Sequence, residues 1–378
     1  MLYVIIILSA VIAFVLEEFL FRTANKKKIL DNPGGRRLHK GAIPRVGGWA
    51  FFVVIAFMTL LFIPLFHEYT SADMKELLPF LFGTGCLFIV GVVDDVEELG
   101  SKIKFAFQII ASIPMVAKIY GFKLLEGSPE TGFTIGFDFM DLVKVGFMMF
   151  FVLWTINSIN LIDGIDGLSG SIGVMTMLPA VYLLDISHNF IIFLVWVSLT
   201  TSICVFLCYN FANGTSKRKM FMGDAGSLVM GYVIAICMLH GWCGDIKTSE
   251  YMLPICSGIC IVPMLDVIVV SLTRYIEGRN PFKADLSHLH HKFLYCGLSA
   301  RKSLIWIICI CLSLATTNFF LFKKGFLTYI SVDVSFILVM YAVLWYNKRK
   351  RSKQIKRHWD SQTGMYVEDL EVQVQQAD

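Results

Sequence analysis

Five aspartates that could bind a metal ion lie where long apolar runs meet polar loops. Asp94 and Asp95 follow one apolar run, Asp163 and Asp166 follow another, and Asp224 precedes a third. Carboxylates that gather at a boundary of low dielectric repel one another by a few kcal/mol at an effective dielectric constant of about 20. A divalent cation or a lysine partner relieves that repulsion. Taken alone, Asp94 and Asp95 could equally be a polar stop at a helix end.

Amide side chains and glycines surround the second acidic loop. Asn157, Asn160 and Asp163 are three residues apart, which places them along one helical face. Gly164 and Gly167 let the backbone approach a ligand. Amide and carboxylate oxygens are hard ligands that suit magnesium. A helix C-cap would explain one glycine but not the other polar residues, so this loop favours a binding site.

The third acidic loop opens an apolar run with Gly223-Asp224-Ala-Gly226-Ser227. Backbone N–H groups at the start of a helix there, with Gly226 and Ser227 beside them, could hold phosphate oxygens while Asp224 coordinates a cation. An ordinary N-cap by Asp224 or Ser227 is the competing explanation, and the two roles are compatible.

A cluster of imidazoles follows farther along the chain. His288, His290 and His291 fall within four positions, near Arg279 and Lys283. Arginine, lysine and imidazole donors together suit a polyanion. Zinc is the rival ligand, but no fixed spacing of zinc ligands is present.

A basic segment and one further aspartate are also candidate functional features. The segment 31–48 is basic and carries Arg45 among prolines and glycines, which indicates a shaped loop; attraction of anionic lipid headgroups is the simpler alternative. Asp266 lies inside an apolar run, eight residues or about 12 Å of helix before Arg274. A carboxylate there is a functional candidate, and a structural pair with Arg274 or a neighbouring helix is the equal alternative.

The elements that must position these residues are membrane-spanning helices. The 378 residues are 56% hydrophobic and only 16% charged, which leaves too little polar surface for a soluble globule. Runs long enough to cross about 30 Å of hydrocarbon predict about eleven spans. They lie near 1–21, 49–66, 78–93, 103–120, 143–161, 171–187, 190–211, 226–244, 252–273, 303–322 and 327–346.

Lysine and arginine predict the orientation, because they are retained on the cytoplasmic side. An N-terminus outside places all three acidic loops, Lys102 and the histidine segment in the cytoplasm. The basic residues left on the other face are then few: Lys75, Lys118, Lys123, Lys144, Lys247, Lys323 and Lys324.

The rest of the chain predicts less. Residues 1–346 form one membrane domain, and 347–378 are expected to be a basic and then acidic cytoplasmic tail that is flexible. The alternating run from Phe133 in the outward loop 121–142 predicts a short hairpin. The ten cysteines show no CxxC spacing and are interpreted as apolar packing residues.

In combination, these loops resemble the polyprenyl-phosphate N-acetylhexosamine-1-phosphate transferases of the glycosyltransferase family 4 type. The matching pieces occur in order over residues 31–291. They are Pro44-Arg45-Val-Gly47-Gly48, Asp94-Asp95, the run from Asn157 to Leu168, Gly223-Asp224-Ala-Gly226-Ser227 and His288-Leu-His290-His291.

The resemblance implies an all-α enzyme of the bacterial cytoplasmic (inner) membrane with ten or eleven helices and a Mg²⁺-dependent site that faces the cytosol, with Mn²⁺ as an alternative. Such enzymes move a sugar 1-phosphate from a UDP-sugar to undecaprenyl phosphate and release UMP. Leu289 interrupts the three consecutive histidines of the peptidoglycan branch, so the chain looks like the WecA/TagO-like branch, which starts O-antigen, teichoic acid or related glycans. UDP-N-acetylglucosamine is then the expected donor. Membrane lipid is an expected partner, nucleic acid is not, and a homodimer is left open.

The resemblance also suggests a role for each matching residue. Asp224 and Asn160 would hold the metal, and Asp94, Asp95, Asp163 and Asp166 would be the catalytic carboxylates. The expected substrate-binding residues are Arg45, Lys102, Asn157, Asn160, Gly226, Ser227, Arg279, His288, His290 and His291.

Two alternatives stay open at this stage. A two-step reaction through an aspartyl-phosphate would use the same carboxylates as a direct attack. A transporter for an anionic phosphorylated metabolite is the rival function, although transporters usually bind near the bilayer midplane with broken helices and repeated halves.

Overall fold

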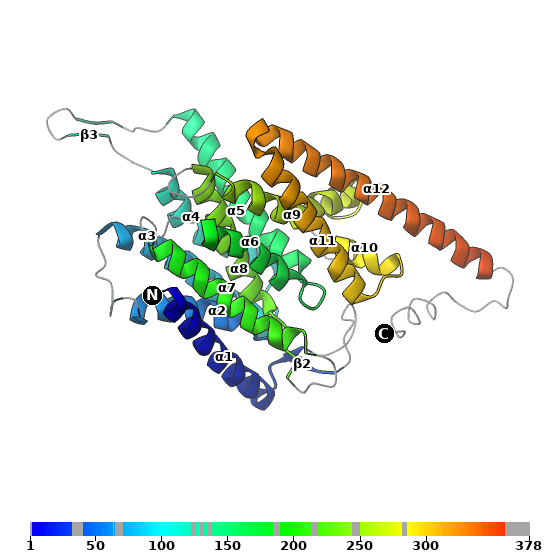
Figure 1. Cartoon of the computed structure of the whole chain (residues 1–378), viewed down its shortest axis with the longest axis horizontal. Coiled ribbons are helices and arrows are strands. Elements are labelled where there is room, and N and C mark those ends of the chain that lie inside the picture. Colours follow the sequence, from blue (N-terminus) through cyan, green and yellow to red (C-terminus); the bar gives the residue numbers. More distant parts are fainter. Residues whose placement is uncertain are drawn as a thin grey trace.

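The computed structural model is a bundle of long helices (Figure 1). It describes residues 2–31, 41–62, 64, 71–121, 126–128, 132–134, 138–183, 190–212, 218–243, 250–281 and 286–359. The chain is a polytopic all-α membrane protein, as its composition predicts. Within the described residues, nine helices are long and apolar enough to cross a membrane.

Each of the eleven expected spans corresponds to a helix. In chain order these are α1 (Leu2–Lys27), α2 (Trp49–Phe57) with the π-helical turn η1 (Met58–Phe62), α3 (Ser71–Glu97), α4 (Ser101–Tyr120), α5 (Phe139–Ile162), α6 (Leu168–Leu183), α7 (Phe190–Asn210), α8 (Gly223–Cys243), α9 (Met252–Ile276), α11 (Ala300–Leu321) and α12 (Phe326–Trp359). The remaining helices are the short α10 (Leu289–Tyr295) and the 3₁₀ turn η3 (Phe322–Lys324).

Two of the expected spans are short. The apolar stretches of α2 with η1 and of α6 are Trp49–Leu61 and Leu168–Leu183. At 1.5 Å per residue, these reach about 20 and 24 Å, less than the roughly 30 Å of hydrocarbon. The orientation of the bundle stays a prediction.

The helix α8 is the centre of the bundle. Its apolar stretch is wholly buried, and it packs against α3 and α5, with α2, α4, α6 and α9 also in contact. Small residues permit this close packing: a Cβ atom added at Gly231 would lie 2.8 Å from the Cα atom of Ile156 in α5. The first residues of α8 are therefore held by helices on several sides.

The basic segment near residue 45 is fixed by backbone pairing. Strand β1 (Leu30–Asp31) pairs antiparallel with β2 (Ile43–Pro44). Phe221 then donates its backbone N–H to the Pro44 carbonyl over 2.8 Å, and Gly48 donates to the Met222 carbonyl over 2.8 Å. This ladder holds the segment alongside the residues that precede α8.

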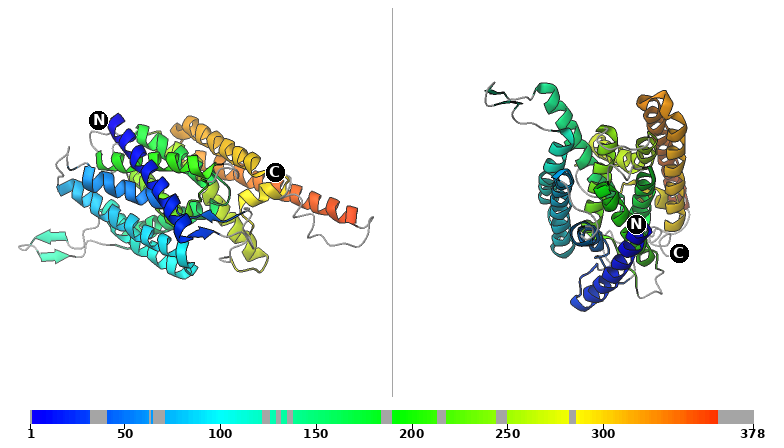
Figure 2. Two further views of the ribbon diagram at one scale, coloured as in Figure 1. Left: turned by 90° about the horizontal axis from the view of Figure 1, so that it is seen from below. Right: turned by 60° about the vertical axis from the view of Figure 1, so that its left-hand side comes forward.

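Two features extend away from the bundle (Figure 2). The predicted hairpin is present as β3 (Glu126–Ser128) paired antiparallel with β4 (Gly132–Thr134), although residues 135–137 of the alternating run lie outside the described residues. At the other end of the molecule, α12 continues to Trp359, past the expected boundary at 346. No glycine or proline occurs between 326 and 359 to end that helix, and the acidic part of the tail, 360–378, lies outside the described residues.

Candidate functional site

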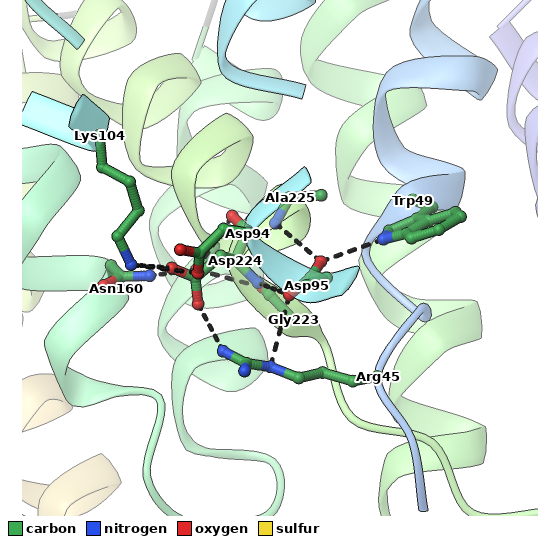
Figure 3. A network of polar contacts seen from close by, with 10 residues as sticks. Arg45, Trp49, Asp94, Asp95, Lys104, Asn160, Gly223, Asp224 and Ala225 are labelled. Carbon is green, nitrogen blue, oxygen red and sulfur yellow. Dashed lines mark hydrogen bonds and ion pairs between the residues drawn. The ribbon is translucent and has the colours of Figure 1, made fainter. Parts of the chain in front are cut away.

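Four helix ends meet at one end of the bundle. The helices α3 and α5 end there, and α4 and α8 begin there (Figure 3). Glycines allow the backbones to touch: a Cβ atom at Gly91 would lie 2.2 Å from the Cα atom of Ala225, and one at Gly48 would lie 2.2 Å from the Cα atom of Gly226. The first turn of α8 is therefore packed directly against α3 and against the start of α2.

Asp95 caps the N-terminus of α8. Its Oδ1 atom accepts a hydrogen bond from the backbone N–H of Asp224 over 2.7 Å, and its Oδ2 atom accepts from that of Ala225 over 3.2 Å. The indole Nε1 of Trp49 donates to Oδ2 over 3.0 Å. The side chain is wholly buried, and it satisfies two of the amide groups that the first turn of a helix leaves without partners.

Asp94 and Asp224 share one lysine. The Nζ atom of Lys104 lies 3.1 Å from Oδ2 of Asp94 and 2.8 Å from Oδ2 of Asp224. Both aspartates are buried, with 4% and 6% of their surface exposed. The ammonium group therefore bridges two carboxylates that would otherwise repel each other across a short, poorly solvated gap.

Arg45 closes the other side of this cluster. Its Nη2 atom lies 2.6 Å from Oδ1 of Asp224, and its Nε atom lies 3.4 Å from Oδ1 of Asp95. Burial works against the charge of the guanidinium, but the neighbouring Asp224 and Asp95 outweigh it and raise the pKa of Arg45 above its usual value. Three carboxylates and two permanent cations thus occupy one site with little net charge.

The loop after α5 lines the adjoining space. Asp163 follows the last residue of α5, and its Oδ1 atom accepts a short hydrogen bond from the Ser169 hydroxyl. Asp163 is open to the solvent of a pocket, yet the protein atoms around it remove part of its hydration. This desolvation raises the pKa of Asp163 to about 6, against the lowering effect of Ser169.

Asp166 and Gly167 join this loop to the segment before α8. The Asp166 carboxylate forms an ion pair with Lys219. The backbone N–H of Gly167, which has φ of +78°, donates to Oδ1 of Asn210, whose Nδ2 donates over 2.9 Å to the Met220 carbonyl. Asn210, at the end of α7, therefore holds the two loops against each other.

The histidine segment packs against the same loop. His290 is 2% exposed, and a Cβ atom added at Gly164 would lie 2.1 Å from its Nε2 atom. Burial lowers the pKa of His290 well below its usual value, which keeps the ring neutral. His288, the residue before α10, is also buried, whereas His291 is half-buried and faces the pocket.

A polar pocket of about 520 Å³ adjoins the cluster. Its walls carry the acidic loop, the basic residues and the last histidine: Arg45, Asn160, Asp163, Asp166, Lys219, Asp224 and His291. A second hollow of about 350 Å³ shares Arg45 and is lined by Asp95. The site is thus a polar recess at the end of the membrane-spanning helices.

The sequence of this chain is similar to those of known proteins. The family model of glycosyl transferase family 4 matches residues 77–241, which include most of α3, all of α5, the start of α8 and all five aspartates. Similarity to proteins with related names extends over most of the chain. The chain is therefore similar to glycosyl transferase family 4 over residues 77–241.

Several curated proteins are similar to this chain over most of their own length. A Bacillus subtilis (strain 168) protein named probable undecaprenyl-phosphate N-acetylglucosaminyl 1-phosphate transferase is 29% identical over 344 residues, which cover 89% of this chain and 88% of that protein. Undecaprenyl-phosphate alpha-N-acetylglucosaminyl 1-phosphate transferases are 28% identical in Yersinia pestis and 27% identical in Escherichia coli (strain K12). Each of these matches covers 76% of both chains.

The structure brings most of the predicted residues together. Asp94, Asp95, Asp224 and Arg45 form one network. Asn160 lies beside Asp224 (Figure 3) and donates from its Nδ2 atom to the Ser227 hydroxyl over 2.8 Å. The predicted residues that line the pocket are Arg45, Asn160, Asp163, Asp166, Asp224 and His291.

Other predicted substrate-binding residues have partners within the protein. Asn157 pairs with Gln108, with 2.7 Å from Nδ2 to Oε1. Ser227 donates to the Gly223 carbonyl of its own helix over 3.2 Å, and Gly226 packs against the start of α2.

Two predicted cations lie at the surface. Arg279 is exposed and forms an ion pair with Glu277. Lys102 is also exposed, and it is Lys104, two residues later, that contacts the carboxylates.

Several functional candidates were missed by the sequence reasoning. Lys104, Trp49, Lys219 and Asn210 contact predicted site residues. Lys104 could have been predicted, because it is a second basic residue two positions after Lys102, in the first turn of α4. Nothing in the sequence distinguishes which of the two lysines faces α8.

The donor set can be compared with the expected magnesium site. Among the residues that the structure describes, no group of three or more His, Cys, Asp and Glu side chains has the arrangement of a metal site. Magnesium, however, usually keeps several waters and takes one or two carboxylates. Asp224 and Asn160 fit that smaller requirement, because Asn160 donates its Nδ2 to Ser227 and leaves its Oδ1 atom available.

Proposed function

We propose that this membrane transferase moves N-acetylglucosamine 1-phosphate from UDP-N-acetylglucosamine to undecaprenyl phosphate. The product would be the diphosphate-linked lipid that begins a cell-surface polysaccharide, and UMP would leave. The named activities of the relatives support the proposal, because these proteins match 89% and 76% of this chain. We place the site at the cytoplasmic face of the inner membrane on the distribution of lysine and arginine.

The double contact of Lys104 with Asp94 and Asp224 carries the proposal. It puts paired carboxylates and a cation at the point where the spanning helices end. A polyprenyl tail stays in hydrocarbon and a UDP-sugar arrives from water, so the reacting phosphates can meet only at such a boundary. An acidic site would repel both anionic substrates unless cations neutralise the charge.

Asp94 is the carboxylate that we assign to the acceptor. Asp95 already accepts hydrogen bonds from two amides of α8 and from Trp49, so its oxygens are engaged in holding the helix. Asp94 contacts side chains of the site instead, namely Lys104 and Asp224. We propose that Asp94 orients the acceptor phosphate or takes its remaining proton.

The acceptor needs little activation. Its phosphate monoester has a second pKa of about 6, so the attacking oxygen is largely deprotonated at neutral pH. That oxygen would attack the donor phosphorus that carries the sugar, the bond to the UMP phosphate would break, and the electron pair would leave with UMP. Lys104 and Arg45 are placed to stabilise charge on the phosphate oxygens.

The donor would occupy the pocket of about 520 Å³. Its volume lies within the range of about 300–1,000 Å³ that is usual for small-molecule sites. Arg45 and Lys219 supply positive charge for the diphosphate, and His291 supplies a ring nitrogen at the pocket wall. The acidic loop would lie beside the nucleotide.

Magnesium is the cofactor that we propose, with Mn²⁺ as a substitute. Asp224 and Asn160 would hold it, and it would neutralise the charge of the diphosphate and polarise its oxygens. Arg45 and Lys104 would release part of the Asp224 carboxylate when the cation binds.

A transfer assay tests the function. The purified protein in detergent is given undecaprenyl phosphate, Mg²⁺ and a panel of labelled UDP-sugars, and both UMP and lipid-linked sugar are measured. We expect product from UDP-N-acetylglucosamine and none with Asp94→Asn. The proposal fails if no UDP-sugar yields lipid-linked product while a phosphorylated solute accumulates in proteoliposomes, which would favour a transporter.

Accessibility labelling tests the location. In a variant whose native cysteines are replaced by serine or alanine, single cysteines are introduced in place of the exposed Lys102, near the site, and of Lys323 at the far end of the bundle. An impermeant thiol reagent should label Lys102→Cys only in inside-out vesicles and Lys323→Cys only in intact cells. The reverse pattern would place the site outside.

A further inference from the structure

Asp266 in α9 accepts three hydrogen bonds from later parts of the chain. Its Oδ2 atom lies 2.8 Å from Nδ1 of His288, and its Oδ1 atom accepts from the backbone N–H of Leu289 over 2.9 Å. The Tyr341 hydroxyl in α12 donates a short hydrogen bond to the same Oδ1 atom. Asp266 is 1% exposed, so these protein donors take the place of water.

This contact fixes the state of the His288 ring. A carboxylate only accepts hydrogen bonds, so Nδ1 of His288 must carry the hydrogen atom. When the ring is neutral, Nε2 is then the acceptor. Asp266 thereby selects one tautomer and one ring orientation.

The rings of His290 and His291 lie between His288 and the site. The rings of His288 and His290 are nearly parallel, at 8° with 6.3 Å between centroids. His290 in turn packs against Gly164, next to Asp163, and lies 4.1 Å by ring centroids from His291 at the pocket wall.

The segment needs such support because α10 has only seven residues. A helix of that length is not stable by itself in water. Asp266 holds Leu289, the first residue of α10, through its backbone N–H. Asp266 is held in turn by Tyr341 of α12, a helix outside residues 77–241.

We propose that Asp266 and Tyr341 are positioning residues, which hold the histidine segment in the orientation that binds the donor substrate. The last membrane helix thereby takes part in donor binding without touching the substrate. This inference rests on the proposed function, because its assay is the transfer reaction. A wild-type protein without transfer would contradict the proposed function, whereas an active wild type with unaffected variants would contradict the positioning role.

Asp266→Asn is the principal variant. Its amide keeps an oxygen for Leu289 and Tyr341 but presents an NH₂ group to His288, which therefore favours the opposite tautomer. We expect the KM for the UDP-sugar to rise and kcat/KM to fall on the order of 10- to 100-fold, with the KM for undecaprenyl phosphate unchanged. Tyr341→Phe should show a smaller loss in the same direction, since two of the three hydrogen bonds remain.

Asp333→Asn is the matched control. Asp333, like Asp266, is a wholly buried carboxylate, but it belongs to α12. Its Oδ2 atom accepts a hydrogen bond of 2.9 Å from Asn318. Asp333 lies about 12 Å along the helix from Tyr341. We expect it to leave both KM values near those of the wild type.

A double-mutant cycle separates positioning from general stability. If Asp266 acts through His288, then Asp266→Asn should have little further effect on the donor KM in a His288→Gln background. Additive losses, or an Asp266→Asn protein with wild-type kinetics, would overturn the proposal. A fall in the active fraction alone, with both KM values unchanged, would also overturn it.

Discussion

The Nζ atom of Lys104 lies 2.8 Å from the Oδ2 atom of Asp224 and, at the same time, 3.1 Å from Oδ2 of Asp94. The two aspartates come from the end of α3 and the start of α8, and the lysine comes from the first turn of α4. Lys102, in the same turn, is exposed. The pair of lysines therefore offers a comparison within one helical turn.

Replacing Lys104 should inactivate the enzyme. Lys104→Met leaves Asp94 and Asp224 close together without their shared cation, and we expect kcat/KM to fall on the order of 100-fold or more. Lys102→Met removes the same charge from the surface and should change the rate by less than about twofold. UMP release by the two purified variants decides the matter, and equal losses would show that the contact is unimportant.

Asp224→Asn should remove both turnover and the response to magnesium. The variant keeps the size of the side chain but loses the negative charge that we assign to metal binding. Binding of Mn²⁺, measured by electron paramagnetic resonance, should weaken in parallel, which gives a readout that does not depend on activity. Glu277→Gln, at an exposed carboxylate, serves as control. Near-normal activity with an unchanged Mg²⁺ titration would contradict the metal assignment.

Gly164→Ala should disturb the histidine segment. The new Cβ atom would lie 2.1 Å from Nε2 of His290, so the buried ring must move. We expect the donor KM to rise with little change in expression. Gly100→Ala is the control, because this loop glycine has φ of −66° and no atom within 4 Å of an added Cβ. If both alanine variants bind the donor as the wild type does, the packing of His290 on the loop has no role in binding.

Asp163→Asn should separate stability from activity. The pKa of Asp163 is raised to about 6 in the folded protein by desolvation, against about 3.9 for an ordinary aspartate. The folded state therefore holds this proton more tightly than the unfolded state. Ionisation destabilises the fold above pH 6, and this penalty disappears as the pH falls from about 6 to about 4.

The asparagine variant lacks this penalty and can still accept the hydrogen bond of Ser169. Its melting temperature in detergent should exceed that of the wild type at pH 7.5 and match it near pH 4, while transfer is lost. Asp166→Asn, which breaks the ion pair with Lys219, should give no such gain. A variant that is less stable than the wild type at pH 7.5 would refute the assignment.

Much of the architecture follows from the chain itself. Each of the eleven apolar runs corresponds to a helix, because a segment in hydrocarbon must satisfy its own backbone hydrogen bonds, and nine of the described helices are long enough to span the membrane. The convergence of Asp94, Asp163 and Asp224 followed from counting those spans, which places the three loops at the same end. The boundary of the tail could not be predicted from hydropathy, because α12 continues as a helix of good helix-forming residues beyond its apolar part.

The partners of individual side chains were beyond sequence reasoning. Asp266 was expected either as a functional carboxylate or as the partner of Arg274 or a neighbouring helix. The alternative of a neighbouring helix is confirmed, because Asp266 accepts a hydrogen bond from Tyr341 of α12 and also contacts His288, whereas Arg274 donates to the Pro281 carbonyl over 2.8 Å. These contacts join residues 22 and 75 positions apart. Helical periodicity gives the face of a side chain but not the helix that lies opposite it.

The burial of α8 has a consequence for how the enzyme responds to its surroundings. A bilayer that is thinner or thicker than the protein acts on lipid-facing helices, which tilt to adapt. The helix that carries Asp224 is surrounded by other helices along its apolar length and has no such contact. We expect Asp224 to keep its position in lipids of different acyl-chain length, as when a cell changes its fatty acids with growth temperature.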